Sequence, residues 1–134
     1  MKKFKVSTRK TELHNLWSLV VRTRDRFICQ WCRKEEHPAN AHHIVTKGSA
    51  GNSGSYEIEN GMTLCVYCHR NRVPCDPDEY IAVRDKWLKD KGLDFWELKA
   101  KYDETAPHFT EDFFAIKKKV LEDILNNLTR RSSF

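Results

Sequence analysis

Long apolar stretches are missing from this sequence. No run approaches the roughly 20 apolar residues that span a bilayer. The basic start MKKFKVSTRK is not followed by an apolar segment of signal-peptide length. We therefore expect a protein without membrane contact that works in a cytoplasm. Cytoplasmic thiols stay reduced, so clustered cysteines are expected to bind a metal rather than to form disulfides.

Internal repeats are absent and glycine is scarce. Three of the five glycines fall in GSAGNSGS (48–55), which is predicted to be a flexible loop. Hydrophobic residues make up 40% and charged residues 32% of the 134 residues. This composition is typical of one soluble, folded domain with a modest core.

Acidic residues are scarce at the N-terminal end. Residues 1–28 hold eight Lys/Arg against two Asp/Glu, whereas the net charge of the whole chain is +5. A basic end on a balanced body predicts contact with a polyanion, nucleic acid first. The alternative is a solvated tail that aids solubility. Three predicted nucleic-acid contacts lie in this segment: Arg22, Arg24 and Arg26.

Apolar spacing predicts helices around a small β-containing centre. An amphipathic helix is expected over 12–25, and β-like pieces over 26–29 and 41–46. MTLCVYCHRNRV (62–73) is predicted to be a short helix that stops near Pro74. Three further helices are expected to begin at capping residues, and Gly92 should end the first of them. The three caps are Asp76, Asp94 and Thr110.

We therefore predict an α+β fold in a single compact domain with three parts. These are a basic N-terminal segment and helix (1–25), a metal-containing core (26–75) and a helical region (76–134). The last helix carries an apolar stripe at helical spacing, which predicts a core face; a homodimer interface is the alternative. The stripe comprises Phe113, Phe114, Ile116, Val120, Leu121, Ile124, Leu125 and Leu128.

Four of the five cysteines form two C-x-x-C pairs, Cys29/Cys32 and Cys65/Cys68. Two thiolates three residues apart can hold one side of a tetrahedral ion, and a second pair closes the site. We therefore predict a closed, structural zinc site, with an iron–sulfur cluster as the alternative. CVYCH also matches the attachment pattern of c-type haem, but haem attachment normally requires export. Cys75 is predicted to take no part.

Histidines lie in and just after the segment between the two cysteine pairs. Its 32 residues exceed the usual zinc-ribbon gap of about 15–20, so we expect this insert to carry the chemistry. His42 and His43 are adjacent on a predicted strand and should therefore face opposite sides. Asn60 and His69 follow in order. The other histidines lack such context and are predicted to be surface residues: His14, His37 and His108.

The ordered motifs of residues 22–73 resemble a known nuclease family. R-D-x-F-x-C-x-x-C, then HHI, then E-N-G-x-x-L-C-x-x-C-H-R is similar to the HNH endonucleases of the ββα-metal type. The eight residues between Asn60 and His69 also fit that family. More loosely, the tail DEYIAVRDKWLKDKGLDFWELK is similar to NinG-type phage recombination nucleases.

This resemblance implies a small zinc-stapled ββα-metal core with flanking helices. It also implies that His42 and His69 hold one divalent cation, Mg²⁺ or Mn²⁺, and that His43 is the general base. A neutral imidazole can accept a proton at physiological pH. Asn60 would fix the loop that positions His43. A further histidine of some family members is replaced here by Val73.

We therefore predict a metal-dependent DNA endonuclease that hydrolyses phosphodiester bonds in nicked, double-stranded or branched DNA. A role in phage-type recombination, repair or packaging is expected. The alternative is a catalytically silent zinc-knuckle module that only binds nucleic acid. Only the nuclease interpretation explains His43 and Asn60. Three cations around the histidines complete the predicted nucleic-acid contacts: Lys47, Arg70 and Arg72.

Overall fold

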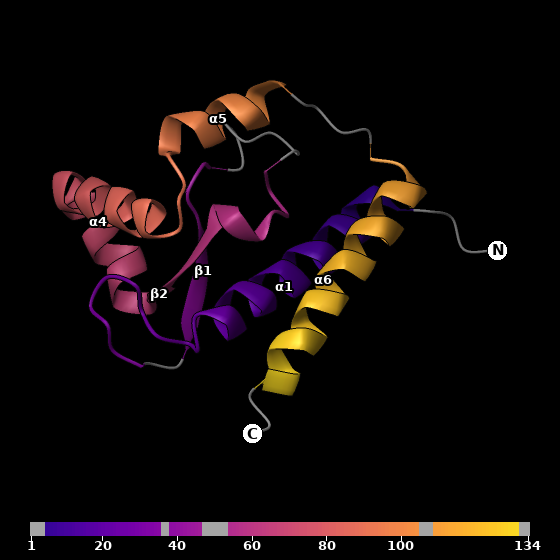
Figure 1. Cartoon of the computed structure of the whole chain (residues 1–134), viewed down its shortest axis with the longest axis horizontal. Coiled ribbons are helices and arrows are strands. Elements are labelled where there is room, and N and C mark those ends of the chain that lie inside the picture. Colours follow the sequence, from indigo (N-terminus) through magenta and orange to yellow (C-terminus); the bar gives the residue numbers. More distant parts are fainter. Residues whose placement is uncertain (1–4, 36–37, 47–53, 105–108, 132–134) are drawn as a thin grey trace.

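The computed structural model describes residues 5–35, 38–46, 54–104 and 109–131, and it has the predicted α+β fold. A two-stranded sheet lies between helices on several sides (Figure 1). The elements in chain order are α1 (Val6–Arg24), β1 (Ala39–His43), η1 (Ile58–Asn60), β2 (Gly61–Cys65), η2 (Cys68–Arg72), α3 (Val73–Cys75), α4 (Pro77–Asp90), α5 (Phe95–Glu104) and α6 (Glu111–Arg131).

Strands β1 and β2 pair antiparallel, with Ala39 opposite Cys65 and His43 opposite Gly61. All five residues of β2 are buried, which ties the sheet into the interior of the molecule. The chain then turns directly from β2 into η2, a single π-helical turn, and on into α3. The order strand, strand, helix is that of the predicted ββα core.

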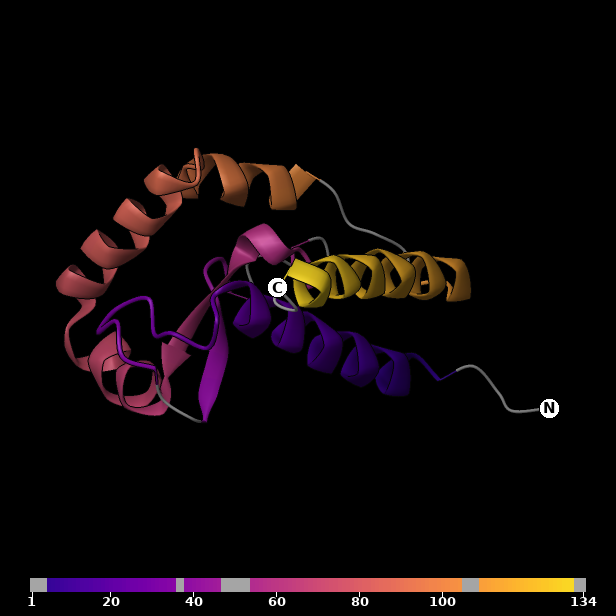
Figure 2. The same ribbon diagram turned by 60° about the horizontal axis from the view of Figure 1, so that its bottom comes forward.

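Helix α1 packs against the sheet, and α6 lies side by side with α1 (Figures 1 and 2). Leu13 and Trp17 of α1 and Phe114 and Leu121 of α6 are buried in one shared core. The predicted core stripe of α6 is confirmed for six of its eight residues. Ile116 and Val120 are instead 65% and 45% exposed, and nothing in the structure tests the homodimer alternative.

Helices α4 and α5 frame a second core, which is built around the cysteines. Trp87 and Leu88 of α4 and Leu98 and Tyr102 of α5 pack in one cluster with Cys29, Cys65 and Cys68. The predicted end of α4 is confirmed, because Gly92 follows it with a φ of +73°.

Two of the three predicted helix caps form the expected hydrogen bonds. The Glu97 amide donates to Asp94 Oδ2 at 3.1 Å, and the Phe113 amide donates to Thr110 Oγ1 at 3.1 Å. Asp76 takes the capping position of α4, but its side chain makes no capping hydrogen bond. Each formed cap stabilises its helix start by about 1 kcal/mol.

Local structure departs from the prediction at two places near the cysteines. Residues 62–65 form a strand rather than the start of a helix, because they pair with β1 and are buried on both faces. The helical turns that follow run past Pro74 to Cys75, with the proline in the first turn of α3, where its missing N–H costs nothing. Of 26–29, only Ile28 takes part in β pairing, in a single bridge to Glu35.

The remaining departures concern the ends of elements. The first helix begins at Val6, six residues before the predicted start. Most of the predicted flexible loop lies outside the described residues, but Gly54 and Ser55 are buried. No helix of the described part combines the length and apolar character needed to cross a bilayer.

Candidate active site and metal centre

The four paired cysteines come together in one cluster. Their sulfur atoms all lie within 4.8 Å of one another, and Cys32 Sγ is 3.9 Å from Cys65 Sγ. Zn–S bonds of about 2.3 Å in a tetrahedron place the sulfurs about 3.8 Å apart. Four thiolates at this spacing fit a closed zinc site, so the cluster can hold a structural metal such as zinc. Cys75 is exposed and takes no part, as predicted.

Each C-x-x-C pair forms a tight turn that supports its first sulfur. The Cys32 amide donates to Cys29 Sγ, and the Cys68 amide donates to Cys65 Sγ, both at 3.4 Å. Burial alone would raise the pKa of the Cys29 thiol, but hydrogen bonds from the backbone at Cys65, Cys32 and Trp31 lower it to about 7. The first turn therefore favours the thiolate of Cys29, the form that binds metal, whereas burial raises the pKa of Cys65 and Cys68.

His43 lies at the end of β1, where two distant parts of the chain hold its ring. Its imidazole stacks on the indole of Trp17 with ring centroids 4.0 Å apart and an angle of 9°. Its Nε2 lies 2.9 Å from the carbonyl oxygen of Ser55. A carbonyl only accepts, so Nε2 carries the proton and the lone pair of the neutral ring is on Nδ1. The ring thus presents a basic nitrogen in a fixed orientation.

Asn60 anchors the loop that carries Ser55. It is fully buried, and its Oδ1 accepts the Val45 amide at 2.7 Å. Its Nδ2 donates to the Val45 carbonyl at 2.9 Å and to the Gly54 carbonyl at 3.0 Å. Through these bonds Asn60 connects Val45, two residues after β1, to Gly54, the residue just before Ser55. The role of Asn60 in fixing the loop that positions His43 stays a prediction, which these contacts support.

His42 faces away from Trp17, toward η2 and α4. Its ring is 5.3 Å from that of His69, centroid to centroid, and its Nε2 is 2.6 Å from Tyr80 Oη. Burial, with smaller contributions from His69 and His43, lowers the pKa of His42 to about 4. Burial and the charge of Arg70 also lower the pKa of His69. Both imidazoles are therefore neutral at pH 7 and able to bind a cation.

A hollow of about 600 Å³ joins these groups. His42 and His43 of β1 and His69 of η2 line it together, so the structure brings the three predicted histidines to one surface. The other lining residues are His14, Ser18, Asn40, Ala41, Thr46 and Arg70.

His14 is the residue of this hollow that sequence reasoning missed. It was predicted to be a surface residue, but its ring lies 5.8 Å from that of His43 and 5.8 Å from that of Trp17. The signal was present in the spacing, because His14 lies three residues before Trp17 on α1 and so shares its face. His37 and His108 lie outside the described residues.

The predicted nucleic-acid contacts have different surroundings. Arg70 is exposed at the hollow, whereas Arg26 is exposed beyond the end of α1. The guanidinium of Arg72 lies over the ring of Trp31, 5.4 Å from its centroid. Arg22 donates back to the Ser18 carbonyl. Lys47 lies outside the described residues.

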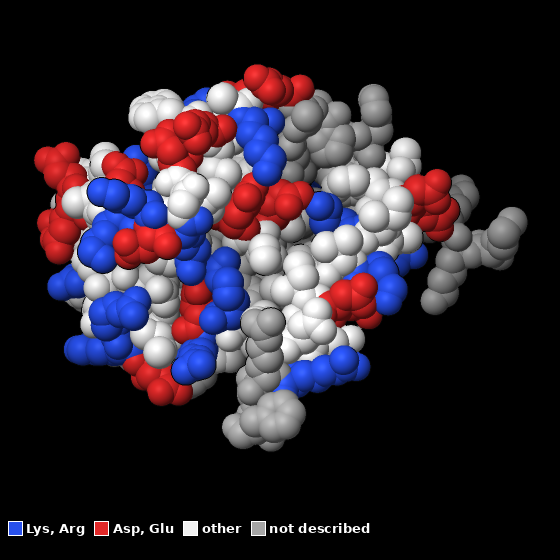
Figure 3. All heavy atoms as spheres, viewed as in Figure 1, with Lys and Arg blue, Asp and Glu red and all other residues white. Residues whose placement is uncertain are grey.

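Arg24, another predicted nucleic-acid contact, also forms bonds within the fold. Its guanidinium pairs with Asp25 at 2.9 Å and donates to the carbonyls of Ile58 and Gly61 at 2.7 and 2.6 Å. Asp25 in turn accepts the Thr63 amide at 3.0 Å. This pair ties the end of α1 to β2. On the face drawn in Figure 3, Lys and Arg are interspersed with Asp and Glu among the described residues.

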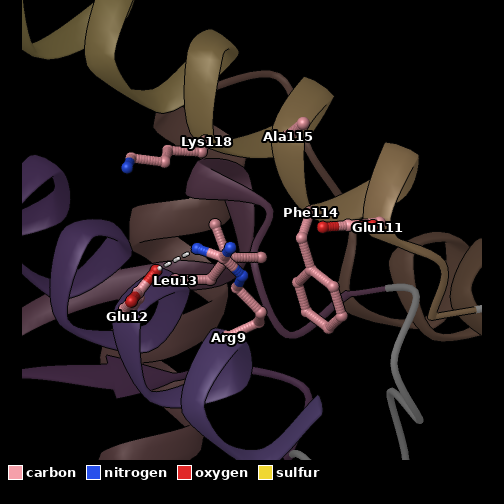
Figure 4. A pocket seen from close by; sticks show the side chains of 7 residues that line it. All are labelled: Arg9, Glu12, Leu13, Glu111, Phe114, Ala115 and Lys118. Carbon is pink, nitrogen blue, oxygen red and sulfur yellow. Dashed lines mark hydrogen bonds and ion pairs between the residues drawn. The ribbon is translucent and has the colours of Figure 1, made fainter. Parts of the chain in front are cut away.

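Another hollow, of about 210 Å³, lies between α1 and α6 (Figure 4). Its cations Arg9 and Lys118 are balanced by the carboxylates of Glu12 and Glu111, and Arg9 pairs with Glu12 at 3.1 Å. Among the described residues that line it there is no histidine. It therefore lacks the paired imidazoles that mark the hollow at β1.

Comparison with known families agrees with this geometry. Residues 29–73 match the family model of the HNH endonucleases. This HNH segment (29–73) contains all four clustered cysteines, three of the four histidines that line the hollow, and Asn60. The match supports a nuclease-type function with a metal site and a nucleic-acid substrate, and it confirms the predicted resemblance. It spans 45 of the 134 residues.

No curated protein and no solved structure matches the chain. The tail that resembles NinG-type nucleases lies outside the HNH segment, so that resemblance stays a prediction.

Proposed function

We propose that the chain is a metal-dependent DNA endonuclease in which His43 is the general base. The observation that carries this proposal is the way His43 is held. The Ser55 carbonyl fixes the proton on Nε2, and Asn60 anchors the loop that supplies this carbonyl. Nδ1, which carries the lone pair, is the atom that would take the proton from an attacking water.

His42 and His69 would hold a divalent cation, Mg²⁺ or Mn²⁺, beside this base. When bound, such a cation neutralises charge on the phosphate and the leaving oxygen. Two protein ligands leave positions open for phosphate oxygens and water, as magnesium-type sites require. Arg70 at the same hollow would attract the phosphate backbone. The zinc cluster holds the fold and takes no part in the reaction.

The substrate proposed is nicked, double-stranded or branched DNA, and the cellular role is phage-type recombination, repair or packaging. We further propose that residues 26–75 are the nuclease core, that 1–25 and 76–134 support it, and that the protein works in the cytoplasm. The other candidate function is a silent zinc-knuckle module that binds nucleic acid without cutting it.

A plasmid nicking assay with Mg²⁺ or Mn²⁺, run with and without EDTA, tests the proposal. His43→Ala should lower the cutting rate by about 10²–10⁴-fold, because the proton acceptor is lost. His42→Ala and His69→Ala should weaken cation binding, and raised Mn²⁺ should partly restore their activity. Zinc content should be unchanged in all three. Normal cutting by all three variants would favour the silent module instead.

A further inference from the structure

Tyr80 lies outside the HNH segment, near the start of α4, yet it contacts a proposed cation ligand. Its Oη is 2.6 Å from Nε2 of His42. The two rings meet edge to face, with centroids 5.3 Å apart and planes at 90°. His42 lines the hollow and Tyr80 does not. The phenol therefore contacts the imidazole from the side away from the hollow.

We propose that Tyr80 is a positioning residue that holds His42 in one ring orientation and one tautomer. This inference rests on the proposed function. A neutral imidazole carries its proton on one nitrogen only, and a phenol oxygen can accept a hydrogen bond while donating its own proton elsewhere. With Nε2–H donating to Tyr80 Oη, the lone pair of His42 is on Nδ1. Nδ1 is then the atom left to hold a cation.

The other proposed ligand is held in a similar way. Asn40 Nδ2 lies 3.3 Å from Nδ1 of His69, so a side chain also occupies one nitrogen of that ring. With Nδ2 as the donor, Nδ1 accepts and Nε2 carries the proton; only the flipped carboxamide, with Oδ1 facing an Nδ1–H, would leave Nε2 for a cation. Metal-bound histidines typically use their second nitrogen for such an outer hydrogen bond, and this bond fixes the tautomer.

The position of Tyr80 depends on the zinc cluster. Trp87 and Leu88 of α4 pack in one core with Cys29, Cys65 and Cys68. The cysteine cluster therefore fixes α4, and α4 presents the phenol to His42. Helix α4 thus completes a site whose ligands all belong to the HNH segment.

The affinity for Mn²⁺ tests this role without relying on cleavage. We would measure free Mn²⁺ by electron paramagnetic resonance in zinc-loaded protein, comparing wild type with Tyr80→Phe. The variant keeps the ring and loses only the hydroxyl. Its dissociation constant for Mn²⁺ should rise about 10–100-fold, as it does when a metal-bound histidine loses the hydrogen-bond partner of its second nitrogen.

Tyr102→Phe is the matched control. Tyr102 of α5 is buried and lies away from the hollow, and its Oη donates to Glu59 Oε1 at 3.0 Å. Its loss removes a comparable hydrogen bond and should leave Mn²⁺ affinity within twofold of wild type. Urea unfolding of both variants checks that each remains folded.

Nitrogen-15 NMR of the wild-type histidines, with Mg²⁺ present, gives a readout that needs no variant. His42 should show the Nε2–H form. Three outcomes would overturn the inference. The first is a neutral His42 ring whose proton is on Nδ1. The second is an unchanged affinity for Mn²⁺ in Tyr80→Phe, while His42→Ala loses Mn²⁺ binding. Either of these two results would leave the proposed function standing. Absence of Mn²⁺ binding in the wild type would overturn both.

Discussion

His43 shows how much of the site depends on single contacts between distant residues. Trp17 supports one face of its ring and the Ser55 carbonyl holds its Nε2, so neither contact comes from the strand that carries it. The indole is itself fixed, because Trp17 Nε1 donates to the Glu57 carbonyl at 2.8 Å. A small displacement of Trp17 should therefore reach the proposed base directly.

Gly61→Ala tests this dependence. A Cβ at Gly61 would lie 2.7 Å from Trp17 Cζ2 and 2.6 Å from Val21 Cγ2, closer than packed atoms allow. We expect a loss of about 1–3 kcal/mol in the free energy of unfolding from overpacking. Cutting should also slow, on the order of 10–10²-fold, because a shift of about 1 Å at a catalytic group has that effect. Urea unfolding and plasmid nicking would be measured together.

Gly92→Ala is the matched control for that change. Gly92 has a φ of +73°, but no atom lies within 4 Å of an added Cβ. The variant should lose about 1 kcal/mol of stability through backbone strain alone and cut DNA at the wild-type rate. Equal rates for the two variants would contradict the proposed transmission through Trp17.

At the scale of elements, the cysteine pairs could be predicted because their signal is local. Two thiols three residues apart define the ligand type and the turn before any tertiary contact forms. The strand β2 could not be predicted this way. Its five residues are buried on both faces, against α1 and against the cysteine core, and even the polar Thr63 between Met62 and Leu64 lies inside. Such a short apolar run looks the same in a buried strand and in a helix.

The cysteine cluster should supply much of the stability of the second core. Cys29→Ser removes one ligand, so the protein should lose its zinc and unfold α4 and α5 along with the cluster, because metal binding and folding are coupled. Zinc content by elemental analysis and helicity by circular dichroism measure both effects. Cys75→Ser, at an exposed thiol outside the cluster, should change neither. Full zinc content in Cys29→Ser would show that the cluster is not the site.

At the scale of the whole molecule, the sequence does not reveal which helices meet the strand that carries His42 and His43. The order of motifs indicated His42, His43, Asn60 and His69, and the structure brings these histidines to one hollow. His14 and Tyr80 approach the same imidazoles from α1 and α4, and only tertiary packing puts them there. Charge along the chain was a weaker guide, since a cation such as Arg24 can be used inside the fold.

Arg70 is therefore the cation whose effect on DNA binding should be clearest. It is exposed and lines the hollow, so it should contact a phosphate and release counterions on binding. In Arg70→Ala, affinity should fall for all DNA sequences alike, and the slope of log K against log salt should become shallower by about one.

Arg33→Ala is the control, because Arg33 is also exposed but lines a separate hollow beside Trp31 and Val83. Fluorescence anisotropy with labelled duplex from 50 to 200 mM salt measures both slopes. The opposite result would be a wild-type slope in Arg70→Ala and a slope shallower by about one in Arg33→Ala. DNA would then bind the hollow beside Trp31 and Val83 rather than the proposed active site.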